Sequence, residues 1–136
     1  MYERAGVNEL SYRECLRLLG TVSLGRLVHS AHALPAVRLV PFAVRESAVI
    51  MRVVDSDVAK AVRDAVVAFQ ADDVLADLGG GWSVTVVGHA TAVKDAAELA
   101  KLAGLRPWPW GIKKDGEYVR IAAEVVSGTR VTSEGG

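Results

Sequence analysis

The hydrophobic pattern of the chain first follows a helical spacing and then changes to the spacing of strands. Ser11 and Glu14 are placed as a capping box, the polar pattern that begins many helices. A hydrophobic helical face follows, made up of Cys15, Leu18 and Leu19. Gly20 then ends the pattern. The sequence therefore predicts a short helix between Ser11 and Gly20, in which Cys15 is a small core residue and not a nucleophile.

Most of the remaining pattern predicts strands, because Val, Leu and Thr are frequent between short turns. We expect strands over Thr21–Ser30, Leu34–Arg45, Ala48–Val54, Val66–Ala71, Trp82–Val93 and one long final strand from Glu117 to Val131. Residues 45–47 have the length of a tight hairpin turn, and Asp72–Gly80 reads as a loop. Gly88 interrupts an alternating strand and predicts a bulge or a close backbone approach.

Two further helices are predicted, over Ser56–Ala65 and over Ala96–Ala103, where Asp95 is the N-cap. Long strands without a strand–helix–strand rhythm favour a closed antiparallel barrel of five or six strands, since closure hides the edges of the sheet. Neither a repeat nor a linker divides the chain, so residues 1–136 should form one domain. Residues 1–9 should be an N-terminal arm and residues 133–136 a tail.

Composition narrows the classes of function. The chain has 136 residues, and its 16 Lys and Arg balance its 16 Asp and Glu. A net charge of zero gives no reason to expect nucleic acid or an anionic membrane as a partner. No apolar run reaches the ~20 residues that span a bilayer, and the N-terminus does not resemble a signal peptide, so we expect a cytoplasmic protein. The three histidines lack the spacing of metal ligands.

The junction between the strand ending at Val54 and the helix starting at Ser56 is the main candidate for chemistry. A helix start presents free backbone N–H groups, which favour an anion. Arg52 on the strand and Lys60 in the helix could add positive charge, which suggests a phosphate-bearing ligand. The alternative is that Arg52 only reaches solvent or Asp55 at the end of its strand.

A second strand arginine, Arg38, interrupts another apolar run. Whether Arg38 and Arg52 share a face depends on the register of the turn at residues 45–47, which the sequence leaves open. Trp108 and Trp110 lie in a proline-rich loop. They could pack on their own barrel, form a dimer interface or stack on a planar ligand.

Seven segments of the chain carry a family resemblance through their order and spacing: Glu14–Leu19, Gly25–Leu27, Val37–Phe42, Val49–Arg52, Val67–Asp73, Gly81–Ala90 and Tyr118–Ile121. Together they resemble the pyridoxamine 5′-phosphate oxidase-like family of flavin-binding split β-barrels, and most of all its small actinobacterial members, which bind FMN or a deazaflavin. The resemblance extends from about Leu10 to Val131, which is nearly the whole chain.

The resemblance implies a six-stranded antiparallel split β-barrel with Greek-key topology that forms a homodimer with two flavin sites at its interface. It places the flavin ring against Arg38, Val40 and Pro41, and the phosphate near Arg52, Ser56 and Lys60. The partner subunit would add Trp108 or Trp110. The implied activity is that of an oxidoreductase, in which FMN or a deazaflavin transfers a hydride or electrons to a small substrate.

The phosphate turn departs from the family, whose FMN-binding members usually show Arg-Thr, a small residue, then Ser or Thr followed by Lys. Val53 and Val58 stand at the Thr and Lys positions here, and Asp55 and Asp57 flank Ser56. A phosphate dianion near a carboxylate is repelled by roughly 5 kcal/mol at an effective dielectric constant of 20. The alternative function is therefore a non-catalytic split-barrel ligand-binding protein that has lost tight FMN binding, or one that uses the cleft for haem or a neutral molecule.

Overall fold

Six antiparallel strands form a closed barrel. The computed structural model describes residues 7–74, 80–104 and 116–132. Neighbouring strands follow the order β6–β5–β2–β3–β4–β7, and β7 also pairs with β6, so the sheet closes on itself. The strands are β2 (Leu24–Ala31), β3 (Leu34–Arg45), β4 (Ala48–Val53), β5 (Val66–Val74), β6 (Gly80–Ala92) and β7 (Glu117–Ala122). The predicted six-stranded antiparallel barrel is thus confirmed.

Strand β6 belongs both to the barrel and to an extension beyond it. Its last residues, Ala90–Ala92, pair with β7, whereas its first eight residues pair with β8 (Val125–Thr132). β1 (Val7–Glu9), part of the predicted N-terminal arm, pairs with β8. The predicted single final strand is wrong, because the chain changes partners around Ala123 and Glu124 and continues as β8.

Gly88 lies where β6 changes from one partner strand to the other. A Cβ atom at this position would overlap the carbonyl oxygen of Ala122, so the close backbone approach predicted for Gly88 is confirmed. Gly128 on β8 is similar, because a Cβ there would come within 2.7 Å of the Cys15 sulfur. The two glycines let β7, β8 and the first helix lie close to the long strand β6.

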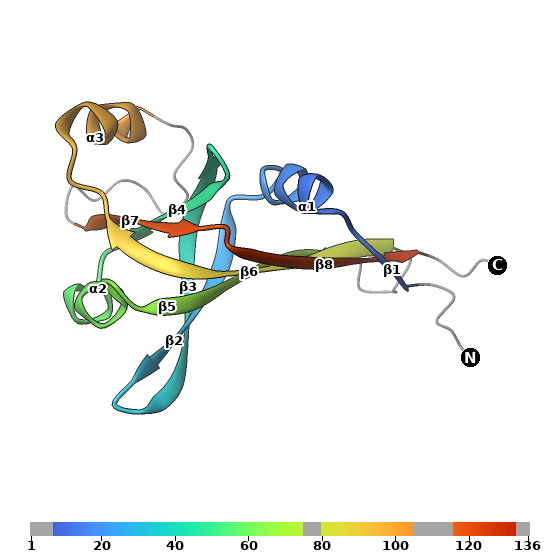
Figure 1. Ribbon diagram of the computed structural model, residues 1–136, viewed down its shortest axis with the longest axis horizontal. Coiled ribbons are helices and arrows are strands. Elements are labelled where there is room, and N and C mark those ends of the chain that lie inside the picture. The colour runs from blue at the N-terminus through green and yellow to red at the C-terminus, as the bar shows by residue number, and fades with distance from the viewer. Residues whose placement is uncertain (1–6, 75–79, 105–115, 133–136) are drawn as a thin grey trace.

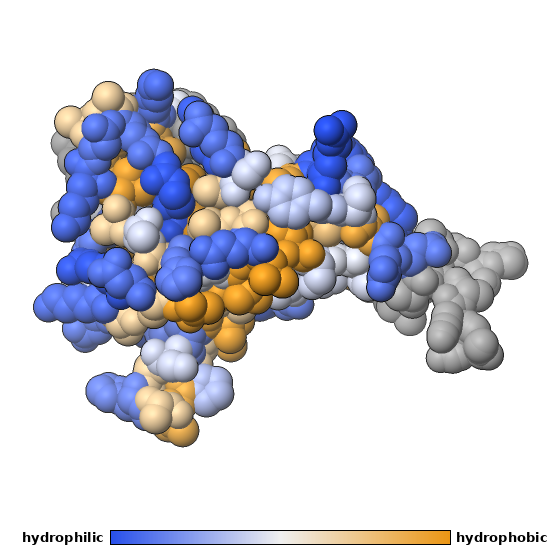
Figure 2. Space-filling view, in the orientation of Figure 1, coloured by the Kyte–Doolittle hydropathy of each residue, from blue (hydrophilic) through white to orange (hydrophobic). Residues whose placement is uncertain are grey.

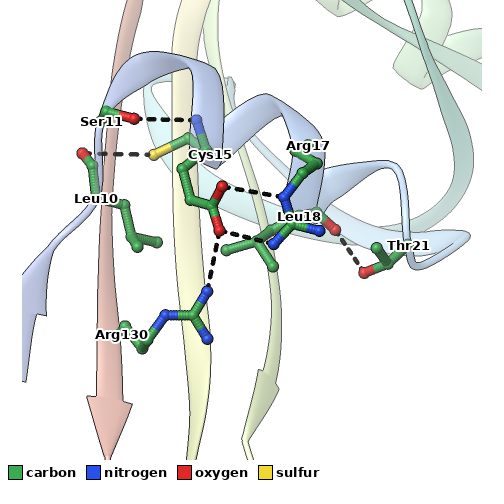
Figure 3. A network of polar contacts seen from close by, with 8 residues as sticks. Leu10, Ser11, Cys15, Arg17, Leu18, Thr21 and Arg130 are labelled. Atoms are coloured by element: carbon green, nitrogen blue, oxygen red, sulfur yellow. Dashed lines mark hydrogen bonds and ion pairs between the residues drawn. The ribbon is translucent and has the colours of Figure 1, made fainter.

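Helix α1 (Tyr12–Leu19) begins at Ser11, whose hydroxyl accepts a hydrogen bond of 3.1 Å from the Glu14 N–H. The Glu14 carboxylate accepts hydrogen bonds from Arg17 in the same helix and from Arg130 of β8 (Figure 3). The carboxylate therefore fixes α1 to the extended part of the sheet.

Helices α2 (Ser56–Val62) and α3 (Ala96–Ala103) lie at the other end of the molecule (Figure 1). α2 ends three residues earlier than predicted, because Arg63 is extended and Asp64 has a φ of 61°. The barrel interior is filled by hydrophobic residues that include Leu27, Met51, Phe69, Val86 and Ile121. A smaller cluster, with Ile50, Leu102 and Tyr118, lies outside the barrel beneath α3.

The β2–β3 hairpin projects from the barrel and is the lowest element in Figure 1. It is longer than β4, its neighbour on one side, which has six residues against twelve in β3. Within the described parts of the chain, none of the helices is long and apolar enough to cross a membrane. The projecting hairpin matters most for function, because it forms one wall of the groove described next.

Candidate functional site

An open groove of about 680 Å³ separates the projecting β2–β3 hairpin from helix α2. The hairpin contributes one wall and the exposed side of α2 the other. The polar residues that line the groove are His29, Ser30, His32, Arg38, Asp57 and Lys60. Its volume lies in the range of roughly 300–1,000 Å³ that is typical of small-molecule sites.

Strand register explains which hairpin residues face the groove. Leu27 pairs with Arg38 and His29 pairs with Ala36, so the side chains of these four residues lie on one face of the hairpin. Leu27 is in the barrel core and Arg38, directly opposite it on β3, lines the groove together with His29 and Ala36, which lie farther along the hairpin. The hairpin ends in a two-residue turn at His32 and Ala33, both of which have positive φ values.

His29 is a buried histidine at the wall of the groove, with an exposed fraction of 7%. Its Nδ1 lies 3.2 Å from the carbonyl oxygen of Ser30. Because a carbonyl can only accept, Nδ1 carries the hydrogen in the neutral ring and Nε2 presents a lone pair. Nε2 has no hydrogen-bond partner among the described residues. A buried polar atom without a partner is costly, so this nitrogen favours a ligand or water molecule that can donate to it.

The start of α2 is already capped by a carboxylate of the protein. Asp55 Oδ1 accepts hydrogen bonds from the N–H groups of Asp57 and Val58, at 2.9 and 3.3 Å. Asp55 Oδ2 accepts from Arg38 Nη2 at 3.3 Å. The Arg38 ion pair is half-exposed, and Lys60 forms no ion pair with any described residue. The groove therefore holds one paired cation, Arg38, and one unpaired cation, Lys60.

Arg52 lies away from this groove. It is 8% exposed, it pairs across the sheet with Tyr118, and its Nη1 donates a hydrogen bond of 2.9 Å to the Tyr118 hydroxyl. The guanidinium carbon is 5.2 Å from the centre of the Tyr118 ring. The alternative in which Arg52 only reaches solvent or Asp55 is wrong, because Arg52 is buried and bonded to Tyr118.

The β3–β4 register settles the question about the two arginines. Phe42 pairs with Met51, and both side chains point into the barrel core. Arg52 follows Met51 and so faces outward, on the side of Ile50 and the cluster beneath α3. Arg38 has the alternation of Phe42 and faces the other way, so Arg38 and Arg52 lie on opposite faces of the sheet.

The other predicted site residues are distributed as follows. Lys60 is exposed and lines the groove with Arg38, whereas Ser56, the exposed first residue of α2, does not line it. Val40 is buried in the barrel core, so it could offer a ligand only its backbone, and Pro41 is half-buried. Trp108 and Trp110 lie outside the described residues.

The sequence did not identify His29, His32 and Asp57 as site residues. Histidines in the sequence drew attention only as metal ligands, and the described residues contain no cluster of three His, Cys, Asp or Glu side chains that could hold a metal ion. The signal in the sequence that could have identified these groove residues was the length of the β2–β3 hairpin. Once His32 and Ala33 are placed in a two-residue turn, the alternation of β2 and β3 puts His29 and Arg38 on the same face.

Comparisons with known proteins agree with this architecture. Residues 11–130 match the family model of pyridoxamine 5′-phosphate oxidase. The uncharacterized protein Rv0080 of Mycobacterium tuberculosis is 38% identical over 134 residues, which cover 94% of this chain and 88% of that protein. The structure of an FAD-binding protein from Mycobacterium smegmatis is similar, with a TM-score of 0.76 and 30% identity over 91% of this chain and 97% of that one. A candidate pyridoxamine 5′-phosphate oxidase from Corynebacterium glutamicum has a TM-score of 0.79 and 31% identity, covering 93% and 94% of the two chains.

Proposed function

The chain belongs to the pyridoxamine 5′-phosphate oxidase family, and from this premise we propose that it is a cytoplasmic homodimer that binds a flavin in the groove between the β2–β3 hairpin and α2. One observation carries the proposal. The similarity to the FAD-binding protein of Mycobacterium smegmatis extends over nearly the full length of both chains. FMN and a deazaflavin are the cofactors expected from the sequence, and FAD is the one that this relative binds.

The groove fits a flavin in size and in the chemistry of its walls. Arg38 and Lys60 offer positive charge to a phosphate group. The lone pair on His29 Nε2 suits a donor such as a ribityl hydroxyl. The groove meets β3 at Ala36 and Arg38, so this part of the strand would lie along the flavin, whereas Val40 and Pro41 do not line the groove. Once bound, the flavin would supply hydride or electron transfer, and the protein would provide position and polarity.

The outer face of the sheet supports a homodimer. The strand pairings align Val125, Val87, Ala68, Val28 and Val37 in one row across β8, β6, β5, β2 and β3. Val125 and Val37, at the two ends of this apolar row, are 61% and 60% exposed. Figure 2 shows hydrophobic side chains gathered over β5, β6 and β8 in the middle of the view.

A second copy of the chain is the partner that we propose for this face. The apolar row ends on the back of the hairpin that lines the groove, so a partner covering the row would lie beside the flavin. A contiguous exposed apolar surface of this kind is typical of a protein–protein interface.

Titration with flavins tests the proposed function. Fluorescence of FAD, FMN, riboflavin or a deazaflavin should be quenched, or its anisotropy raised, to saturation at one flavin per chain. Arg38→Ala should weaken the binding of a phosphate-bearing flavin by about fivefold, because it removes a cation and leaves the Asp55 carboxylate uncompensated. Arg63→Ala is the matched control, since Arg63 is also a half-exposed arginine paired with an acid, Glu117, but does not line the groove. If none of the four flavins binds, the proposal is wrong.

A second function is favoured by the Asp55 cap. Because the Asp55 carboxylate already accepts from the N–H groups at the start of α2, the groove also suits a non-catalytic split-barrel ligand-binding protein that has lost tight FMN binding. The flavin titrations, followed by anaerobic addition of NADH or NADPH, separate the two functions. Bleaching of the absorbance of bound flavin, followed by recovery on addition of an acceptor, supports the oxidoreductase. Weak FMN binding without reduction by either nucleotide supports the non-catalytic protein.

A further inference from the structure

One buried nitrogen atom at the groove has no hydrogen-bond partner. Across the part of the chain that the structure describes, His29 Nε2 is the only buried side-chain nitrogen or oxygen atom of this kind. The His29 side chain lines the groove, yet the residue is only 7% exposed, so bulk water does not supply the missing partner. Buried polar atoms are nearly always paired, and an unpaired one lowers stability. This nitrogen therefore favours a partner that arrives with the ligand.

The neighbouring backbone determines what His29 can bind. The Ser30 carbonyl oxygen lies 3.2 Å from Nδ1 and can only accept, so the hydrogen of the neutral ring is held on Nδ1. The other neutral tautomer would bring two lone pairs together at this contact and would leave an unpaired N–H at Nε2. Nε2 is thus restricted to accepting a hydrogen bond.

The charged side chains that line the groove have the opposite preference. Arg38 and Lys60 only donate hydrogen bonds, so they suit phosphate or carbonyl groups, which accept. The same groups would turn their lone pairs toward the lone pair of His29 Nε2. Asp57 also accepts, but its side chain is exposed and solvent reaches it without a ligand. A well-matched ligand therefore brings acceptors to Arg38 and Lys60 and a neutral donor to His29.

We propose that His29 determines ligand specificity in this groove by requiring a neutral N–H or O–H donor at Nε2. This inference rests on the proposed flavin binding. A flavin has two donors of this kind, the imide N–H at N3 of the ring and the hydroxyl groups of the ribityl chain. A flavin that lacks both donors would leave Nε2 unpaired and should bind more weakly.

Four flavins without phosphate test this requirement and distinguish the two donors. Riboflavin has both donors, lumiflavin has only the imide N–H, 3-methylriboflavin has only the hydroxyl groups, and 3-methyllumiflavin has neither. The wild-type protein should bind riboflavin about tenfold more tightly than 3-methyllumiflavin. His29→Phe, which retains a planar ring that cannot accept, should narrow this preference about fivefold. Fluorescence titrations measure the four affinities, and the donor whose removal costs affinity in the wild-type protein but not in His29→Phe is the one that His29 binds.

A matched control separates this effect from a general effect of the substitution. His89→Phe makes the same change at a half-exposed histidine of β6 that does not line the groove, and should leave the preference unchanged. Thermal unfolding of the ligand-free proteins gives a second measurement. Because His29→Phe removes an unpaired buried nitrogen, its melting temperature should equal or exceed that of the wild-type protein. A lower melting temperature with an unchanged preference would show that His29 is a packing residue.

The outcomes distinguish the inference from the function on which it rests. If the wild-type protein binds all four flavins equally, or if His29→Phe weakens all four to the same extent, His29 does not select a donor although the flavin function stands. If neither these flavins nor FMN and FAD bind the wild-type protein, the flavin function fails and the inference fails with it.

Discussion

Glu14 illustrates how one half-buried side chain can connect distant parts of the chain. Its carboxylate binds Arg17 within α1 and Arg130 on β8, 116 positions later in the sequence (Figure 3). The hydrogen bond from Arg17 is the main reason that the pKa of Glu14 lies below its ordinary value of 4.5, and the charge of Arg130 lowers the pKa further. The charged form of Glu14 is thus favoured in the folded protein.

This pKa shift predicts a pH dependence of stability. A carboxyl group with a lowered pKa in the folded state stabilises the protein above its ordinary pKa, and this contribution is lost as the pH falls through the lowered value. Glu14→Gln should therefore reduce the melting temperature near neutral pH and flatten its decline below about pH 4.5. The effect should be small, because the ion pairs are exposed to solvent. Glu46→Gln, in the β3–β4 turn, is the control, and a parallel decline in both variants would contradict the prediction.

Arg52 shows why side-chain partners are harder to predict than strands. The sequence marks Arg52 as unusual because it interrupts an apolar strand, and Arg52 is indeed a buried charged residue in that strand. Its partner Tyr118 lies 66 positions away and is brought opposite only by the pairing of β4 with β7. Strand alternation alone could not show whether Arg52 faces the groove or α3, since this depends on the register set at the turn of Glu46 and Ser47.

Strand β6 depends on Gly88, because the backbone of the β7–β8 connection lies directly against it. Gly88→Ala would place a methyl group on the Ala122 carbonyl oxygen, and neither backbone segment can move without disturbing a strand pair. We expect a loss of about 2–4 kcal/mol in the free energy of unfolding, at or above the usual cost of overpacking. Urea unfolding measures this change.

Gly104→Ala provides the comparison for Gly88→Ala. Gly104 is the C-cap of α3, has a φ of −87°, and its added Cβ would lie no closer than 3.6 Å to another atom. The free energy of unfolding of the Gly104→Ala protein should differ from that of the wild-type protein by no more than about 0.5 kcal/mol. Equal effects of the two variants would mean that the contact with Ala122 does not limit the fold.

The elements that the sequence predicts well are those with strong local signals. The capping box at Ser11, the cap at Asp95 and the alternation along β6 each fixed an element within a few residues. The sequence did not predict the break at Ala123 and Glu124. Strand-forming residues stand on both sides of this break, and neither Gly nor Pro occurs at it. A change of pairing partner, in contrast to a turn, leaves no local signal.

The candidate site was only partly predictable for the same reason. Arg38 and Lys60 were identified separately, from an apolar strand and from a helix, and the structure brings them to one groove. The pairing of Arg38 with Asp55 could not be predicted, since it requires both the β3–β4 register and the start of α2. The sequence showed that acidic residues stand at the start of α2, but it did not show that Arg38 is the partner of Asp55.

At the scale of the whole molecule, the uncovered outer face of the sheet is the feature that the monomer leaves unexplained. Helix α1 packs against the core side of the sheet through its buried Cys15, and α2 and α3 lie at the other end of the molecule. None of the described helices covers the row from Val125 to Val37. Burial of this row against a second copy would remove apolar area from water at about 25 cal/mol per Å².

A charge at either end of this row should therefore dissociate the proposed dimer. Val125→Glu and Val37→Glu would each bury a carboxylate opposite apolar side chains, which is strongly unfavourable without a partner charge. Light scattering after size-exclusion chromatography should show two chains per particle for the wild-type protein and one for each variant. Ala97→Glu adds the same charge on the exposed side of α3 and should remain dimeric. A monomeric wild-type protein would contradict the proposed interface.

The two variants also test whether the flavin site needs the partner subunit. Val37 lies on the back of the groove hairpin, so Val37→Glu could disturb the groove directly, whereas Val125 is on β8, at the opposite end of the row. If Val125→Glu is folded and monomeric and binds flavin at least tenfold more weakly, the partner must complete the site, because Val125 itself does not line the groove. Unchanged affinity in a monomeric Val125→Glu would show that the hairpin and α2 of a single chain are sufficient. The groove would then be a complete site whose pairing across the sheet serves stability alone.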